Sequence, residues 1–135
     1  MGYCSDVVLA IAPEAASAFM ALCAKYPKVL ELCHEADEFK SGYEQEGDYF
    51  MYWADIKWSD SDDEMAAINT FVEMLDADDM SEYGEADAPR GEHIVIGTTQ
   101  WHEYFKFIRI GEDDADVTNL GWGFDNIGYT RNINF

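Results

Sequence analysis

The side chains that could do chemistry in this chain are carboxylates, and they are concentrated between residues 55 and 87. Twelve of the 28 acidic residues lie in that stretch, together with a single base. Asp76, Asp78 and Asp87 match positions 1, 3 and 12 of a calcium-binding EF-hand loop, but position 5 is a methionine and position 6, which requires glycine, is a serine. Because these two positions do not match the calcium-binding pattern, we expect no bound metal ion. We expect no other cofactor either.

Catalytic motifs are not recognisable in the rest of the sequence. The three histidines, His34, His93 and His102, have no partner histidine or cysteine at zinc-ligand spacing. Nucleophile motifs built on serine, cysteine or lysine are missing, and so are the glycine-rich loops that hold phosphates. Residues 121–123, Gly-Trp-Gly, are interpreted as a tight turn around a core aromatic. We therefore predict that the protein is not an enzyme.

The acidic stretch contains the clearest amphipathic helix of the chain, which we predict over residues 62–77. Ser61 and Glu64 are spaced as a capping box, and the acids of the first turn face the positive end of the helix dipole. The acids at the start of the helix therefore have a local explanation. Its apolar side chains recur at helical spacing and would anchor it to a core: Met65, Ile68, Phe71, Val72 and Leu75.

The acids at the end of this helix have no such explanation. Asp76, Asp78 and Asp79 lie where the dipole is negative, and each could cost roughly 0.3–1 kcal/mol at low salt. No base lies within one turn of them in the sequence. We infer that these acids serve either solubility or the binding of a positively charged partner.

The net charge limits the classes of partner. Eight basic and 28 acidic residues give −20 at pH 7, with a pI of about 4.1. Phosphates would repel such a surface, so we expect no direct nucleic-acid binding and no membrane association. Basic proteins, above all those with a nucleic-acid-binding groove, are the favoured partners. Residues 1–34 carry three acids and two bases, whereas residues 35–87 carry eighteen acids and two bases. Adaptation to high salt would place acids over all exposed faces, so this uneven distribution argues against a halophilic protein.

Length and cysteine content predict one domain in a reducing cytoplasm. A chain of 135 residues with 48% hydrophobic residues can bury a core as a single domain. Cys4, Cys23 and Cys33 form no C-x-x-C pair, and the first residues lack the basic and apolar regions of a signal peptide. We expect reduced thiols. No apolar run approaches the length of about 18 residues that a membrane span needs.

The order of the predicted elements indicates an α+β fold. Short links favour antiparallel pairing, so the simplest architecture is a mainly antiparallel sheet with two main helices packed on one face. In chain order we predict a strand at 7–11, helices at 13–26 and 27–33, a weak strand or irregular arm at 35–43, a strand at 49–58, the helix at 62–77, an acidic loop at 78–91, and strands at 93–99, 104–110, 117–122 and 129–135.

The strand at 49–58 alternates along its whole length. One face carries Phe50, Tyr52, Ala54, Ile56 and Trp58, and the other begins with Tyr49, Met51 and Trp53. The second face is therefore either covered by another segment or exposed as an aromatic patch. If it is exposed, its aromatic residues could anchor a partner, because interfaces often use Trp and Tyr in this way.

A face dense in carboxylates could imitate a nucleic acid. Duplex DNA presents one negative charge per roughly 1.7 Å of axis, and about ten carboxylates a few ångströms apart approach that density. Fast, salt-sensitive association with a basic groove would follow. The predicted partner-binding residues are Asp60, Asp62, Asp63, Glu73, Asp76, Asp78, Asp79, Glu82, Glu85 and Asp87, with Trp53 and Tyr83 as aromatic anchors.

Two short segments, Met1-Gly2-Tyr3-Cys4-Ser5-Asp6-Val7 and Trp53-Ala54-Asp55-Ile56-Lys57-Trp58, resemble segments of small bacteriophage accessory proteins. The resemblance covers about a tenth of the 135 residues and implies a phage or prophage origin. Small, very acidic phage accessory proteins are often inhibitors of host defence. The resemblance thus implies an anti-CRISPR or anti-restriction protein that acts in the bacterial cytoplasm on a nucleic-acid-binding host protein, and it implies no active residues.

Two other functions stay open at this point. The protein could be a structural or regulatory phage protein whose acidity only keeps it soluble, in which case neutralising the acids would leave its activity intact. It could also be a divalent-cation-binding module, in which case calcium, magnesium or manganese would raise its melting temperature.

Overall fold

The computed structural model describes residues 4–59, 61–78, 101–112, 116–124, 126–129 and 133–135, and these ranges confirm the predicted α+β fold. The strand predicted at 93–99 and most of the acidic loop predicted at 78–91 lie outside the described residues. The elements are β1 (Ser5–Ile11), α1 (Pro13–Lys25), α2 (Pro27–His34), β2 (Glu38–Ser41), β3 (Tyr49–Ile56), α3 (Asp63–Asp76), the 3-10 turn η1 (Trp101–Glu103), β4 (Phe105–Gly111), β5 (Val117–Leu120), β6 (Gly128–Tyr129) and β7 (Ile133–Asn134).

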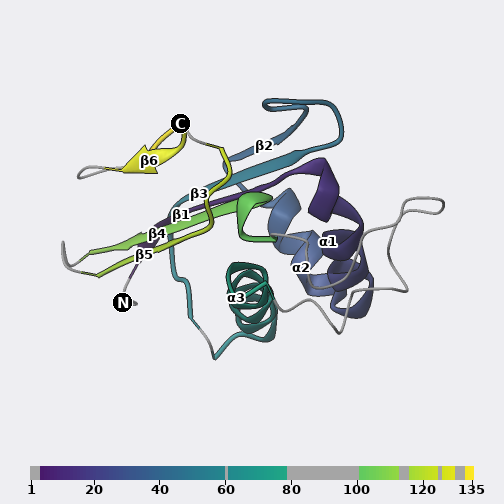
Figure 1. The fold of residues 1–135 in the computed structure, drawn as a ribbon. Helices are drawn as coiled ribbons and strands as arrows, with labels where there is room; N and C mark the ends of the chain where they lie inside the picture. Colours follow the sequence, from purple (N-terminus) through teal and green to yellow (C-terminus); the bar gives the residue numbers. More distant parts are fainter. Residues whose placement is uncertain (1–3, 60, 79–100, 113–115, 125, 130–132) are drawn as a thin grey trace.

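Five of the strands form an antiparallel sheet in the order β2-β3-β1-β4-β5 (Figure 1). The central strand, β1, pairs Leu9 with Met51 of β3 on one side and with Phe107 of β4 on the other. Residues 7–11 are fully buried, because helices cover one face of the sheet and the end of the chain covers the other. This double cover explains why the sequence of β1 is a continuous apolar run and not an alternating one.

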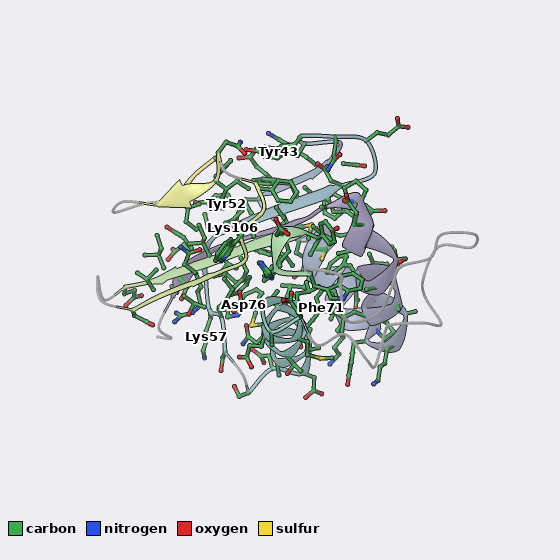
Figure 2. The ribbon with its side chains drawn as sticks, viewed as in Figure 1. Tyr43, Tyr52, Lys57, Phe71, Asp76 and Lys106 are labelled. Atoms are coloured by element: carbon green, nitrogen blue, oxygen red, sulfur yellow. The ribbon has the colours of Figure 1, made fainter. Side chains whose placement is uncertain are left out.

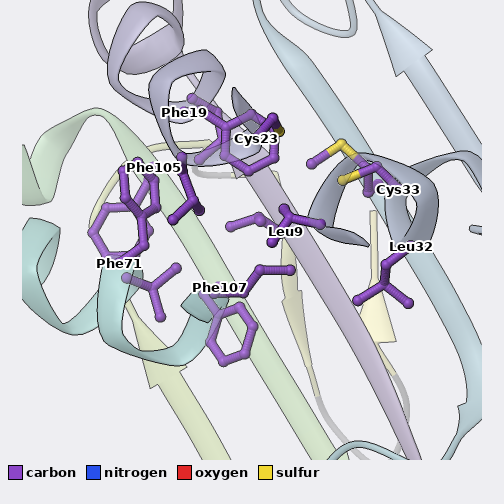
Figure 3. Close-up of a cluster of buried hydrophobic side chains, with 14 of the residues drawn as sticks. Leu9, Phe19, Cys23, Leu32, Cys33, Phe71, Phe105 and Phe107 are labelled. Atoms are coloured by element: carbon purple, nitrogen blue, oxygen red, sulfur yellow. The ribbon is translucent and has the colours of Figure 1, made fainter. Parts of the chain in front are cut away.

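The helices α1, α2 and α3 lie together on one face of the sheet, as predicted (Figure 1). Pro13 and Pro27 begin α1 and α2, where a missing backbone N–H costs nothing. Figure 3 shows how side chains from the helices and the strands meet in the core between them. Phe19 of α1 lies against Phe71 of α3, with ring centroids 5.9 Å apart. The core thus fixes which side of α3 is buried.

The end of the chain covers the opposite face of the sheet. Phe124, Ile127 and Ile133 are buried there in one cluster with Phe50 and Ile108. The single strand predicted at 129–135 is wrong, since β6 and β7 pair with each other as a separate two-stranded antiparallel sheet (Figure 1).

Strand β3 departs from its predicted alternation at Asp55. Asp55 has φ of 54°, in the left-handed region, and its N–H donates to Oδ1 of Asp6 at 2.9 Å. The pairing register with β1 shifts at this point, as in a bulge, so the side chains beyond it change face. Trp58 therefore packs on the helix side with Trp53, with ring centroids 5.4 Å apart, and the prediction that Trp58 shares a face with Phe50 is wrong.

The start of α3 also differs from the prediction. Asp62 occupies the N-cap position, and no side chain caps the helix there. The hydroxyl of Ser61 instead hydrogen-bonds the hydroxyl of Ser59 at 2.7 Å, so the predicted capping box does not form. The helix is tied to the end of β3 in another way, because the indole N–H of Trp58 donates to Oδ1 of Asn69 at 2.9 Å.

The buried thiols give a first prediction. Burial raises the pKa of Cys23 to about 11 and that of Cys33 to about 12. Desolvation and the charges of Asp55 and Glu112 raise the pKa of Cys4 as well, but its thiol is only partly buried, so a reagent reaches it more easily. Because the thiolate is the reactive form, we expect a thiol reagent at about pH 8 to modify Cys4 of the folded protein well before the other two. Mass spectrometry of the time course, before and after unfolding in urea, measures this. Cys4→Ser should abolish the first modification, and early labelling of Cys33 would contradict the buried arrangement.

Candidate interaction site at the end of helix α3

Three segments that are distant in sequence meet at the end of α3: the helix C-terminus, η1 and the residues that follow β5. Oδ1 of Asp76 accepts a hydrogen bond from the N–H of Gly121 at 3.1 Å. Oδ1 of Asp78 accepts the N–H of His102 at 3.0 Å, and Nδ1 of the His102 ring lies 2.9 and 3.0 Å from the two Asp78 oxygens. Asp76 is labelled near the end of the helix in Figure 2.

These contacts correct the interpretation of the helix-end acids. Because the sequence has no base within a turn of Asp76 and Asp78, it predicts that these acids serve solubility or an external partner. The structure supplies donors from the same chain, 45 and 24 residues away in sequence. These hydrogen bonds offset the unfavourable interaction of the two carboxylates with the helix dipole. An external partner is therefore not needed to explain why acids lie at this end of the helix.

The His102 contact lowers the pKa of Asp78. Desolvation alone would raise this pKa, but the hydrogen bonds from the backbone and the ring of His102, together with the charge of the ring, outweigh it. A carboxylate that accepts such bonds is stabilised in its charged form. Asp78 thus acts as a clamp between the end of α3 and η1 while it is ionised.

A pH-dependent contribution to stability follows from this shift. Because the folded-state pKa of Asp78 lies below its unfolded value, the contribution is present above about pH 4 and is lost as the pH falls through the folded pKa. We expect the difference in unfolding free energy between the wild type and Asp78→Asn to shrink as the pH falls below about 4. Urea unfolding from neutral to acidic pH measures it. Glu73→Gln, at an exposed site on the same helix, is the control, and an unchanged Asp78→Asn difference at acidic pH would contradict the clamp.

A cavity of about 530 Å³ opens beside these contacts. Asp76, Lys106 and Asn119 supply its polar groups, and the ammonium group of Lys106 donates to the carbonyl of Gly121 at 3.1 Å. Both charged residues are labelled in Figure 2. The rest of the lining comes from Gly121, Trp122, Gly123, Phe124 and Ile127.

Trp122 is the most exposed large hydrophobic residue in the described part of the chain, at 72%. A Cβ at Gly121 would lie 2.3 Å from the carbonyl oxygen of Phe105, and one at Gly123 would lie 2.8 Å from that of Glu103. Both glycines thus lie against the chain at the start of β4, and the indole ring between them is exposed beside the cavity. The tight turn is present, with φ of 87° at Gly121, but the prediction that it surrounds a core aromatic is wrong.

Apart from Trp53, the predicted partner-binding residues fall into three groups. Asp62, Asp63 and Glu73 are exposed on or next to α3. Asp76 and Asp78 are also exposed but make the intramolecular contacts described above. The others lie outside the described residues: Asp60, Asp79, Glu82, Tyr83, Glu85 and Asp87.

Trp53 is not an exposed anchor. Its side chain is 2% exposed in the core beneath the helices, and its indole N–H donates to the carbonyl of Leu32 at 2.9 Å. The second face of the 49–58 segment is therefore covered. The aromatic residue that is exposed near the acidic helix is Trp122. Its flanking glycines were the only sequence signal for it, and they indicated a turn without showing which way the ring points.

Cation binding gains no support from this region. Asp76 and Asp78, at EF-hand positions 1 and 3, accept hydrogen bonds from Gly121 and His102. Across the described ranges, no group of three or more histidine, cysteine, aspartate or glutamate side chains is arranged to hold a metal ion.

Comparison with known proteins gives no relative. The chain matches no family model, no curated protein and no solved structure. Among the helices described, none is both long enough and apolar enough to cross a membrane. The function proposed below is therefore argued from this chain's own residues and not from a matched relative.

Proposed function

We propose that this protein is a non-enzymatic binding protein that occupies the nucleic-acid-binding surface of a basic protein through the carboxylates on and around α3. One observation carries the proposal. Asp62, Asp63 and Glu73 are exposed, and none of them forms an ion pair with another described residue. Charges that the described residues leave unneutralised are available to a positively charged surface.

The packing of α3 supports this use of its outer side. Ile68, Phe71 and Leu75 are fully buried, so the helix is held by its apolar side and its acids are directed to solvent. With a net charge of −20, the long-range field attracts a basic groove and repels nucleic acid. The resemblance to phage accessory proteins supports a host defence protein of the CRISPR or restriction type, in the bacterial cytoplasm, as the target.

A second function is favoured by the contacts of Asp76 and Asp78. Two acids that the helix dipole disfavours stabilise the fold internally, as they would in a structural or regulatory protein whose acidity only keeps it soluble. The two functions differ in whether exposed acids of α3 matter more than exposed acids elsewhere. This difference can be measured.

The test compares two double variants with the same change of charge. Asp63→Asn with Glu73→Gln removes two exposed acids from α3, and Glu14→Gln with Glu46→Gln removes two exposed acids from other elements. The readout is displacement of DNA from a purified CRISPR effector or restriction enzyme, followed by fluorescence anisotropy. We expect the wild type to displace DNA, with an effect that weakens at least about tenfold between low and moderate salt.

The α3 variant should lose considerably more displacement than the control variant. Equal losses in the two variants would favour the solubility function. Displacement that does not change with ionic strength would contradict binding through the acidic surface.

A further inference from the structure

We propose that Trp122 and Asp76 form an anchor for an arginine side chain of the basic partner. This inference rests on the proposed function and names the position on the surface at which a side chain of the partner is bound. The inference is argued from the exposed indole ring of Trp122 and the cavity next to it. The acidic side of α3 alone would not indicate this binding position.

The ring of Trp122 is exposed but held in place. Its backbone N–H donates to the carbonyl of His102 at 2.6 Å, and its ring meets the His102 ring edge-on, with centroids 5.1 Å apart. His102 is itself clamped by Asp78. A large aromatic that is fixed before binding loses little conformational freedom when a partner covers it, which is why interface hot spots favour Trp.

Asp76 supplies the charge beside this ring. Its Oδ1 is used by the N–H of Gly121, while its Oδ2 accepts no hydrogen bond from any described residue, and the carboxylate lines the cavity. Asn119 is exposed on the same lining and offers an amide oxygen. The cavity volume of about 530 Å³ lies within the roughly 300–1,000 Å³ of small-ligand pockets, so a single side chain fits.

These groups suit a guanidinium better than an ammonium group. The planar guanidinium stacks on an indole and at the same time donates several hydrogen bonds to carboxylate and amide oxygens. Lys106 brings a positive charge into the same cavity, so a ligand that offers only charge is partly repelled. For an arginine, stacking of the guanidinium on the ring of Trp122 offsets the repulsion by Lys106. We therefore expect the site to bind arginine more tightly than lysine.

The experiment uses two synthetic probes, a nine-residue peptide that alternates arginine and glycine, and the same peptide with lysine in place of arginine. Affinities for the full chain are measured by calorimetry at low salt. We expect the wild type to prefer the arginine peptide by about two- to fivefold, the range of a surface cation–π contact. Trp122→Ala should abolish the preference, and Asp76→Asn, which keeps an oxygen acceptor for Gly121, should weaken arginine binding more than the control Glu46→Gln does, at an exposed acid away from α3.

Each outcome is decisive. If Trp122→Ala keeps the arginine preference, or if Asp76→Asn and Glu46→Gln have equal effects, the anchor is overturned. The proposed function then still stands, provided that both peptides bind in a salt-dependent way and that Asp63→Asn with Glu73→Gln weakens them. If neither peptide binds the wild type at low salt, the anchor and the proposed basic partner are both overturned.

Discussion

Replacing Trp53 with alanine is expected to lower the free energy of unfolding by about 3–5 kcal/mol, the usual cost of removing a buried Trp or Phe side chain. The side chain is 2% exposed and lies against Trp58 in the core between the helices and the sheet. The substitution also removes the indole hydrogen bond to the carbonyl of Leu32, which keeps a longer one from the N–H of Glu35 at 3.2 Å, so this loss adds about 0.5–1.5 kcal/mol. Small domains are stable by only about 5–15 kcal/mol, so this variant is expected to be largely destabilised.

Urea unfolding followed by circular dichroism measures the effect. Trp53→Phe helps to separate the two causes, because it keeps most of the apolar volume while it removes the indole N–H and the smaller part of the ring. Trp122→Ala is the matched control, since the same residue type is 72% exposed there and should cost less than about 0.5 kcal/mol. Similar losses at the two positions would show that Trp53 is not in the core.

Gly121→Ala is the second substitution with a large expected effect. Gly121 has φ of 87°, and its new Cβ would lie 2.3 Å from the carbonyl oxygen of Phe105. Left-handed strain costs about 1–3 kcal/mol and overpacking about 1–3 kcal/mol more, so we expect a loss of about 2–6 kcal/mol. The rigid backbone of β4 cannot give way as a flexible side chain would.

Gly42→Ala is the control for this substitution. Gly42 has φ of 77°, but a Cβ there would meet nothing within 4 Å, so this variant reports the left-handed strain alone. Thermal unfolding of both variants gives the comparison. If Gly121→Ala is no worse than Gly42→Ala, the close approach of Gly121 to Phe105 is not a constraint on the fold.

The sequence was sufficient to predict most elements because their signals are local. Pro13 and Pro27 mark the starts of two helices, and the period of Ile68, Phe71 and Leu75 marks the buried side of a third. The fold class follows from the order of these elements. The alternation of residues 104–110 likewise places Phe107 and Ile108 on opposite faces of the sheet, as the two core clusters confirm.

The parts that were not predicted depend on contacts between distant residues. The change of face after Asp55 is tied to a hydrogen bond with Asp6, 49 residues away, and no pattern within the strand signals it. The separate pairing of β6 with β7 is hidden because the alternation of residues 129–135 reads equally well as one strand.

The candidate site was only partly predictable for the same reason. The density of carboxylates identified α3, but the partner of Asp78 is His102, which was set aside because no metal ligand lies near it in sequence. Asp48 is a further example. It is fully buried and accepts hydrogen bonds from the N–H groups of Tyr43, Glu44 and Gln45, and no local pattern in the sequence indicates this burial.

The central place of β1 in the sheet has a consequence for synthesis on the ribosome. Its neighbour β3 is complete at Ile56, but its other neighbour, β4, begins only at Phe105. At roughly 5–20 residues per second, the nascent chain waits about 5–20 s between completing β1 and reaching β4. During that interval one edge of the most apolar strand lacks its native neighbour and is open to pairing with other chains. Chaperones that shield such edges are therefore expected to raise the yield of this protein.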